Sequence, residues 1–422
     1  MSETIYALSS GAPPAGIGVI RISGSGAGSV LERLSGGLPP ERSPRLRALR
    51  NATGDTLDQA LILWFRGPAT VTGEDLAEIH CHGGRAVIAA ILQELGTYAG
   101  LREAEPGEFT RRAFGNGKID LAEAEGLADL LSAETEMQRR GAMLSVGGEL
   151  SRRIEGWRER VLGFAAAVEA VIDFADEDDV AGLPGDFHAR LEDLAAEIRG
   201  IAAQPATERL RDGIRVVLAG PPNAGKSSLF NALLADDAAI VTAEAGTTRD
   251  VLERPVAIGG VPFVLVDTAG MRESGAGAIE EIGIERARRE VSAGQIVLWL
   301  GEEADAPEGA ICVRSKSDIH SSKSGGLQVS AVTGAGIERL TALLVERGRT
   351  ALPPVDRLAF NRRQRDWALA AAEGLSAVRV DDDLLLVAEH LRTARRALDR
   401  LVGRESTEEM LDTLFGRFCI GK

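Results

Sequence analysis

Residues 220–227 read Gly-Pro-Pro-Asn-Ala-Gly-Lys-Ser and fit the phosphate-loop pattern G-x-x-x-x-G-K-S. An apolar run over 214–219, expected as a strand, precedes this loop, and a helical pattern over 228–234 follows it, which is the context that the motif requires. Glycines let backbone N–H groups wrap phosphates, the Lys226 ammonium neutralises the β- and γ-phosphate oxygens, and the Ser227 hydroxyl is a Mg²⁺ ligand. The pattern therefore predicts a nucleoside triphosphate site.

Two later segments carry the remaining parts of a nucleotide switch. Asp267-Thr-Ala-Gly270 ends a strand expected over 263–266, where the Asp267 carboxylate can hold Mg²⁺ through water and the Gly270 amide can meet the γ-phosphate. Thr248, in the run Gly-Thr-Thr-Arg-Asp over 246–250, is placed to complete the Mg²⁺ shell. The order and spacing of these segments favour a nucleotide hydrolase of the GTPase type.

The choice of base and the hydrolytic group are less direct. Asp318 can accept two hydrogen bonds from guanine N1 and N2, which adenine does not offer, and Lys316 can pack along the base, so GTP is predicted. Ser315 stands where the usual GTPase element begins with Asn. Met271 stands where a Ras-type enzyme has a water-orienting Gln, so either hydrolysis is slow or another group and another charge stabiliser supply the chemistry. The candidates in the following segment are Glu273, Glu280 and Glu281.

The elements that must hold these residues follow from the hydrophobic pattern. Over 213–350, short apolar strands alternate with helical stretches, as in a parallel α/β domain. Residues 119–212 and 351–422 have helical patterns, and neither segment is large enough to form a stable domain by itself. Residues 1–118 combine short apolar runs with Gly- and Pro-rich turns. We therefore expect a multidomain α/β chain: a small α+β N-terminal domain, then a helical, bundle-like domain into which a P-loop GTPase domain is inserted.

Composition bounds the class of protein. The 422 residues are 44% hydrophobic and 26% charged, as in an ordinary globular protein with several domains. A net charge of −15 excludes bulk attraction to nucleic acid or anionic membrane but allows a local basic patch. Three cysteines without metal spacing indicate thiols in a reducing compartment. Without a long apolar stretch or a signal-like start, we expect a cytoplasmic protein with no membrane contact.

Beyond the phosphate loop, the chain resembles the MnmE (TrmE) family of tRNA modification GTPases over almost its whole length. The terminus Phe418-Cys-Ile-Gly-Lys422 is the most specific match. The other matching motifs are Gly18-Val-Ile-Arg-Ile-Ser23, Thr72-Gly-Glu-Asp75, His82-Gly-Gly84, Glu105-Pro-Gly-Glu-Phe109, Ala124-Glu-Gly-Leu-Ala-Asp129 and Ile282-Gly-Ile-Glu-Arg286.

The resemblance implies an activity and partners. Members form homodimers and work with the flavoprotein MnmG, which carries FAD, in a heterotetramer or larger complex. Together the two proteins add an aminomethyl or carboxymethylaminomethyl group to C5 of the wobble uridine of tRNA. The one-carbon unit comes from 5,10-methylenetetrahydrofolate, of which 5-formyltetrahydrofolate is an analogue. Hydrolysis of GTP is activated by K⁺-dependent dimerisation of the GTPase domains and drives the conformational cycle.

The resemblance also assigns roles to residues of this chain. Asn223, Thr242, Glu244 and Thr247 would surround K⁺, Ser227 and Thr248 would bind Mg²⁺, and Glu280 would be the catalytic, water-orienting glutamate. With the motifs above, the expected nucleotide contacts are Asn223, Ala224, Gly225, Lys226, Ser227, Ser228, Thr242, Thr247, Thr248, Asp267, Thr268, Ala269, Gly270, Lys316 and Asp318. The expected folate contacts are Arg21, Glu78, Lys118 and Lys422. Cys419 is either a catalytic nucleophile or a small buried residue.

The helical segments hold the basic clusters on which tRNA binding would have to rest. They are Arg139-Arg140, the group Arg152, Arg153, Arg158 and Arg160, the group Arg362, Arg363 and Arg365, and the group Arg392, Arg395, Arg396 and Arg400. Two other functions stay open at this point. One is an RNA-binding GTPase switch of the ribosome-assembly type, and the other is a folate-dependent one-carbon transferase with a vestigial nucleotide site.

Overall fold

The computed structural model describes residues 3–173, 182–235, 239–241, 252–267, 296–319, 326–354 and 356–422. The chain forms two compact units, of which unit 1 comprises Met1–Ala128 with Val402–Lys422 and unit 2 comprises Asp129–Leu401. The last residues of the chain therefore belong to the same unit as the first.

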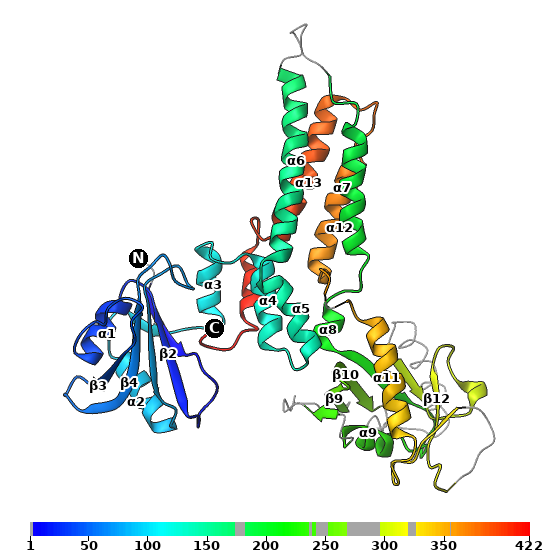
Figure 1. Ribbon diagram of the computed structural model, residues 1–422, viewed down its shortest axis with the longest axis horizontal. Coiled ribbons are helices and arrows are strands. Elements are labelled where there is room, and N and C mark those ends of the chain that lie inside the picture. The colour runs from blue at the N-terminus through cyan, green and yellow to red at the C-terminus, as the bar shows by residue number, and fades with distance from the viewer. Residues whose placement is uncertain are drawn as a thin grey trace. The chain divides into compact units, whose positions relative to one another are not determined.

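Unit 1 is built on a six-stranded sheet in the order β3-β4-β5-β2-β1-β6, in which only β1 and β6 pair in parallel. Helices α1 (Ala27–Ser35) and α2 (Arg85–Leu95) cover one face, where Ile20, Ile22 and Ile79 are buried by the alternation of side chains along each strand. Figure 1 shows these helices against the sheet. The strands are β1 (Thr4–Leu8), β2 (Ile17–Ser23), β3 (Arg45–Arg50), β4 (Thr56–Phe65), β5 (Leu76–His82) and β6 (Leu101–Glu103).

The rest of unit 1 is helical and includes the end of the chain. Its helices are α3 (Glu108–Gly115), the start of α4 (Leu121–Leu131) and α14 (Glu408–Phe415). Phe415 packs against Phe114 of α3 and against Phe418, and Leu121 of α4 belongs to the same buried cluster. An aromatic core thus anchors the C-terminal segment to α3 and α4.

Unit 2 contains a bundle of long helices (Figure 1), each of which buries an apolar stripe. Helix α13 packs against α12 and α6, and α12 also packs against α7. The helices of this unit outside the α/β region are α5 (Glu136–Val146), α6 (Glu149–Asp173), α7 (Phe187–Ala202), α8 (Glu208–Asp212), α12 (Arg362–Ser376) and α13 (Leu384–Leu401). Since α6 and α7 precede the α/β region and α12 and α13 follow it, the predicted insertion into a helical domain is confirmed.

The inserted region is a seven-stranded sheet in the order β13-β12-β11-β7-β10-β9-β8. The strands from β13 to β10 are parallel, and β9 and β8 continue the sheet antiparallel, with the β9–β10 hairpin turning at Gly259-Gly260 as predicted. Helices α9 (Lys226–Leu234) and α11 (Ile337–Ala351) pack on this sheet, and Glu303–Asp305 forms a short 3₁₀ helix. The strands are β7 (Ile214–Ala219), β8 (Ala239–Val241), β9 (Leu252–Ile258), β10 (Val261–Asp267), β11 (Ile296–Trp299), β12 (Ile311–Arg314) and β13 (Leu327–Gln328).

The expected fold class, a multidomain α/β chain with an α+β N-terminal domain, is therefore confirmed. Within the described ranges, none of the helices combines the length and the apolar character that spanning a bilayer requires.

Candidate functional site

The phosphate loop lies between the end of β7 and the start of α9, as the sequence predicts. Gly225 has φ +91° and Asn223 φ +60°, so the loop uses left-handed backbone at two positions. Gly220 has φ +143°, and a Cβ there would lie 3.0 Å from the backbone of Leu300 on the neighbouring strand end. Only glycine therefore allows the loop to leave β7 at this place.

Lys226 and Asp267 supply the charges beside this loop. The Lys226 Nζ donates to the carbonyls of Gly220 and Pro221, each at 2.8 Å. Burial lowers the pKa of this ammonium, and the negative charge of Asp267 opposes that shift. Asp267 is 1% exposed and ends β10, which pairs directly with β7, so its carboxylate lies at the same sheet edge as the loop.

Of the remaining predicted nucleotide contacts, some lie among the residues that the structure describes and others do not. Ser227 and Ser228 are exposed in the first turn of α9, and Asn223 is exposed in the loop. The other expected contacts, Thr242, Glu244, Thr247, Thr248, Thr268, Ala269, Gly270 and the proposed catalytic Glu280, lie outside the described residues.

Two residues of the predicted base-recognition segment bond to the phosphate loop, and a third bonds to Ser330. The Lys316 Nζ donates to the carbonyl of Asn223 at 2.9 Å, and the Ser315 hydroxyl donates to the carbonyl of Ala224. The Asp318 carboxylate accepts a hydrogen bond of 2.6 Å from the hydroxyl of Ser330. The fold thus brings together residues about ninety positions apart, and Ser330 orients the carboxylate that would read the base.

In unit 1, Arg21 and Glu78 form an ion pair on the sheet face opposite α1 and α2, in which two guanidinium nitrogens donate to one carboxylate oxygen. Their positions are directly opposite in the β2–β5 register, and the Arg21 Nη2 lies 2.9 Å from Glu78 Oε1. The Glu78 carboxylate also lies 3.3 Å from the His80 ring. The Arg21 guanidinium is 5.9 Å from the centre of the Phe109 ring of α3. Sequence reasoning missed Phe109, which was visible only as the last residue of a matching motif.

The C-terminal segment reaches the neighbourhood of this pair. The Phe109 amide donates to the Lys422 carbonyl at 3.2 Å, and Ile420 forms a β-bridge with Pro106. Gly421 is buried with φ +91°, and a Cβ there would lie 2.1 Å from the Leu8 carbonyl oxygen. The backbone of Lys422 is thus bonded to the residue whose ring lies beside the Arg21 guanidinium.

Two further predicted residues of unit 1 occupy different environments. Lys118 is exposed, and its Cε lies 3.1 Å from the place that a Cβ at Gly73 would take. Cys419 is exposed, whereas Cys81 is buried in the sheet core. Of the two interpretations of Cys419, the small buried residue is wrong.

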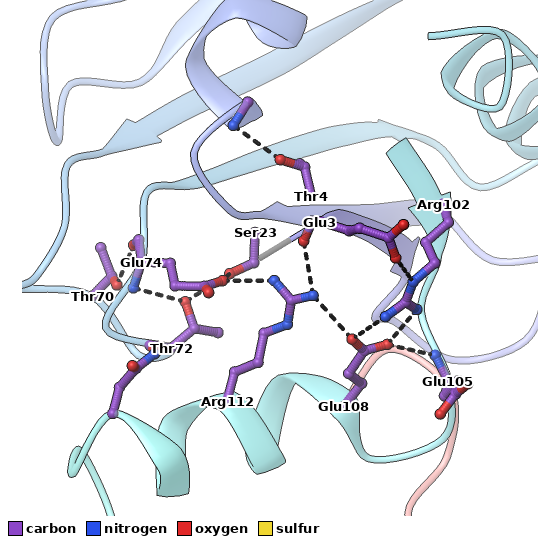
Figure 2. Close-up of polar contacts among 12 residues, drawn as sticks. Glu3, Thr4, Ser23, Thr70, Thr72, Glu74, Arg102, Glu105, Glu108 and Arg112 are labelled. Atoms are coloured by element: carbon purple, nitrogen blue, oxygen red, sulfur yellow. Dashed lines mark hydrogen bonds and ion pairs between the residues drawn. The ribbon is translucent and has the colours of Figure 1, made fainter. Parts of the chain in front are cut away.

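A polar network that the sequence did not predict holds α3 to the strands (Figure 2). The Arg112 guanidinium donates to Glu74, to Glu108 and to the carbonyl of Glu3, at 2.8, 3.0 and 2.8 Å. Arg102 forms a bidentate pair with Glu108, at 2.7 and 2.8 Å. Glu108 and Arg112 are four residues apart on α3, but the other partners lie on β6, before β1 and in the loop before β5, so local patterns could not have revealed the network as a whole.

Several arginines expected to contact tRNA form ion pairs inside the helical segments. The pairs are Arg139 with Glu136, Arg153 and Arg160 with Glu197, Arg158 with Glu155 and Asp399, and Arg392 with Glu389. The exposed members of the clusters include Arg140, Arg152, Arg362 and Arg396. The positive charge available to a polyanion is therefore smaller than the count of arginines implies.

Comparisons with known proteins agree with this arrangement. The family model of the MnmE helical domain matches residues 121–419, and that of the N-terminus of the GTP-binding protein TrmE matches residues 4–118. A tRNA modification GTPase MnmE from Erythrobacter litoralis is 58% identical over 423 residues, covering 100% of both chains. A protein of the same name from Rhizorhabdus wittichii is 55% identical over 426 residues, covering 100% of this chain and 97% of that one. Because both units and the phosphate loop match over the full length, this chain belongs to the MnmE family.

Proposed function

We propose that this protein is a GTP hydrolase that acts in the modification of tRNA. The observation that carries the proposal is the convergence of Lys226, Asp267 and the Ser315–Asp318 segment on one phosphate loop, in a chain that belongs to the MnmE family. A phosphate site alone would serve many nucleotides, whereas a carboxylate held beside it selects guanine. GTP is therefore the proposed nucleotide, with Mg²⁺.

The residues present fit a magnesium nucleotide. The loop offers backbone amides between glycines, the half-buried Lys226 ammonium needs an anionic partner in place of carbonyls, and the exposed Ser227 hydroxyl is free to serve as a metal ligand together with the carboxylate of Asp267 through water. When bound, Mg²⁺ would neutralise phosphate charge. Thr248 would complete its shell.

We also propose that GTP hydrolysis by this protein requires K⁺. Asn223 places an exposed amide at the mouth of the phosphate loop, where it would share a K⁺ ion with Thr242, Glu244 and Thr247. Such an ion stabilises charge only in a preorganised, dry shell, which accounts for a requirement that two GTPase domains dimerise. Glu280 would orient the attacking water, because Met271 cannot.

The second part of the proposal concerns unit 1. Arg21, Glu78, Lys118 and Lys422 would bind a reduced folate, with cations for its anionic tail and a carboxylate for the donor edge of its pterin ring. The exposure of Cys419, and the docking of its neighbours beside Phe109, support access of this thiol to a bound folate. Methylenetetrahydrofolate would supply the one-carbon unit for C5 of the wobble uridine, in complex with MnmG and its FAD. The protein would act as a homodimer in the cytoplasm.

Hydrolysis of GTP in K⁺ and in Na⁺, at equal ionic strength, tests the first part. We expect an acceleration of about a hundredfold in K⁺, the size of effect that one preorganised charge stabiliser has on a transition state. Glu280→Ala should remove the K⁺-stimulated rate, while Glu273→Ala, a matched substitution in the same segment, should retain it. Equal, slow rates in both salts would contradict the mechanism, and failure to bind GTP would contradict the assignment as a GTPase.

Binding of 5-formyltetrahydrofolate tests the second part separately. Arg21→Ala should weaken binding about tenfold or more, because a charge-assisted hydrogen bond is lost. Arg45→Ala, at an exposed position on β3, is the control. Equal affinity of both variants would remove Arg21 from the folate site without affecting the GTPase assignment.

A further inference from the structure

The segment after β12 is held to the phosphate loop on one side and to the end of β13 on the other. The Ser315 hydroxyl and the Lys316 ammonium donate to the carbonyls of Ala224 and Asn223. On the opposite side, the Ser317 amide donates to the Val329 carbonyl at 3.1 Å. Ser315 therefore lies at the junction between the part of the site that would read the base and the part that would hold the phosphates.

The fit between the two loops at this junction is close. A Cβ built on Gly225 would lie 3.2 Å from the Ser315 Oγ, so the backbone of the phosphate loop lies directly against the hydroxyl. An unbranched side chain longer than serine at position 315 would need another rotamer to avoid Gly225, whereas serine fits without displacing the phosphate loop.

The Ser315 hydroxyl has a single proton, and this proton is already engaged in the hydrogen bond to the Ala224 carbonyl. A serine donates one hydrogen bond, whereas the amide of the more usual asparagine has two N–H groups. Since Ser315 donates to Ala224, its remaining capacity is as an acceptor, and it cannot also donate to a nucleotide. The role of Ser315 is thus limited to the loop contact.

That contact has a direct consequence for the phosphates. The peptide unit between Ala224 and Gly225 is planar, so a hydrogen bond that fixes the Ala224 carbonyl also fixes the direction of the Gly225 N–H, on the opposite side of the unit. This N–H is one of the amides that line the phosphate loop. The hydroxyl of Ser315 therefore holds a phosphate-binding group in place from behind.

We propose that Ser315 is a positioning residue that couples base recognition to phosphate binding through the Ala224 carbonyl. It would hold the loop without donating a hydrogen bond to the base. This inference rests on the proposed GTPase function and adds to it a residue whose type departs from the usual motif.

Titration calorimetry with GDP and with 7-deaza-GDP, which lacks the N7 acceptor of guanine, tests the proposal. Ser315→Ala should weaken both nucleotides by the same factor, about five- to tenfold for the loss of one hydrogen bond. Ser315→Thr keeps the hydroxyl and should restore the affinity. In hydrolysis, KM for GTP should rise in Ser315→Ala while kcat stays within about twofold.

The control is Ser29→Ala, which removes a hydroxyl that likewise donates to a backbone carbonyl, in α1. It should leave nucleotide affinity unchanged. A loss with GDP that vanishes with 7-deaza-GDP would show a direct base contact and overturn the proposal, as would equal affinities of Ser315→Ala and the unsubstituted protein. Failure of the unsubstituted protein to bind GDP would overturn the proposed function itself, so the two failures are distinguishable.

Discussion

Lys226 is a half-buried cation that the phosphate loop holds by two backbone carbonyls. Removing an ammonium from water is costly, which is why burial lowers the pKa of this group, and the carbonyl contacts and the nearby Asp267 offset only part of that cost. A phosphate anion is a stronger partner than a carbonyl. The site is therefore arranged to gain most when a polyphosphate binds.

Lys226→Ala should weaken GTP and GDP binding about tenfold to a hundredfold, since it removes hydrogen bonds from a charged donor. The measurement is a fluorescence titration with a labelled GDP at fixed salt. Arg347→Ala, at an exposed position of α11, removes a cation elsewhere on the same domain and should leave the affinity unchanged. Equal loss in both variants would point to general electrostatics in place of a specific contact.

At the scale of elements, helix α3 is held by charged contacts in addition to the apolar packing of Phe109 and Phe114. Although burial of the Glu108 carboxyl raises its pKa, hydrogen bonds from Arg102, the Glu105 amide and Arg112 prevail and lower it to about 2. Glu108 therefore favours folding as a carboxylate. This contribution is complete above the ordinary pKa of a glutamate, about 4.3, and is lost as the pH falls towards 2.

Glu108→Gln should destabilise unit 1 at pH 7 by about 2 kcal/mol, because it removes the carboxylate that Arg102 and Arg112 share, while their pairs with Glu3 and Glu74 remain. The difference between variant and unsubstituted protein should narrow as the pH falls from about 5 to about 2. Hydrogen exchange of the α3 amides at several pH values measures it. Glu105→Gln, which neutralises an exposed carboxylate three residues away, is the control, and a difference independent of pH would contradict the ion-pair explanation.

The C-terminal segment is a second element whose position depends on one residue type. Gly421 combines φ +91° with a contact to the Leu8 carbonyl that leaves no room for a Cβ. Any other residue would be strained in its backbone and would also collide with β1. The docking of Lys422 and the placement of Cys419 therefore depend on this glycine.

Gly421→Ala should release the segment and expose the Phe109 amide, which donates to the Lys422 carbonyl. We expect hydrogen exchange at Phe109 to accelerate about tenfold or more, the effect of losing roughly 1.4 kcal/mol or more of local stability. Gly163→Ala on α6, where a Cβ meets nothing within 4 Å, should leave this exchange unchanged. Unaltered exchange in Gly421→Ala would mean that other contacts, such as the packing of Phe415 and Phe418 and the Ile420–Pro106 bridge, are sufficient to hold the segment.

At the scale of the whole molecule, the distribution of charge limits where tRNA can bind. The protein carries a net charge of −15, so binding of a polyanion must use a local excess of arginine. On α13, Arg395 lies 4.0 Å from Asp399 of the same helix, and Asp399 also pairs with Arg158 of α6, so this aspartate helps to hold the two helices together. Arg396 is exposed, and Arg392 pairs along its own helix with Glu389.

Charge reversal at Arg392 and Arg396 together should therefore weaken tRNA binding about tenfold and reduce its dependence on salt, because fewer counterions are released. Filter binding over a range of salt concentrations measures both quantities. Arg347→Glu in the GTPase domain is the control for net charge. Unchanged affinity and slope would remove this face of α13 from the tRNA site.

Local patterns of the sequence were sufficient to predict several secondary-structure elements of the nucleotide site. The strand Ile214–Ala219, the loop after it and the hairpin at Gly259-Gly260 were predictable, because their signals lie within a few residues of one another. The apolar stripe of α6, including Leu150 and Val168, was predictable for the same reason, since helical periodicity is a local property.

The sequence by itself thus determined the fold class, the phosphate loop and the family resemblance, all of which depend on contiguous residues. Only the tertiary structure decided which distant groups meet: Ser315 with Ala224, Arg158 with Asp399 across 241 positions, and the C-terminal segment with Phe109. It also decided that several arginines are neutralised and that Cys419 is exposed. The reason is physical. A motif indicates which chemistry a side chain is capable of, whereas the burial and pairing of that side chain depend on neighbours that tertiary packing brings to it.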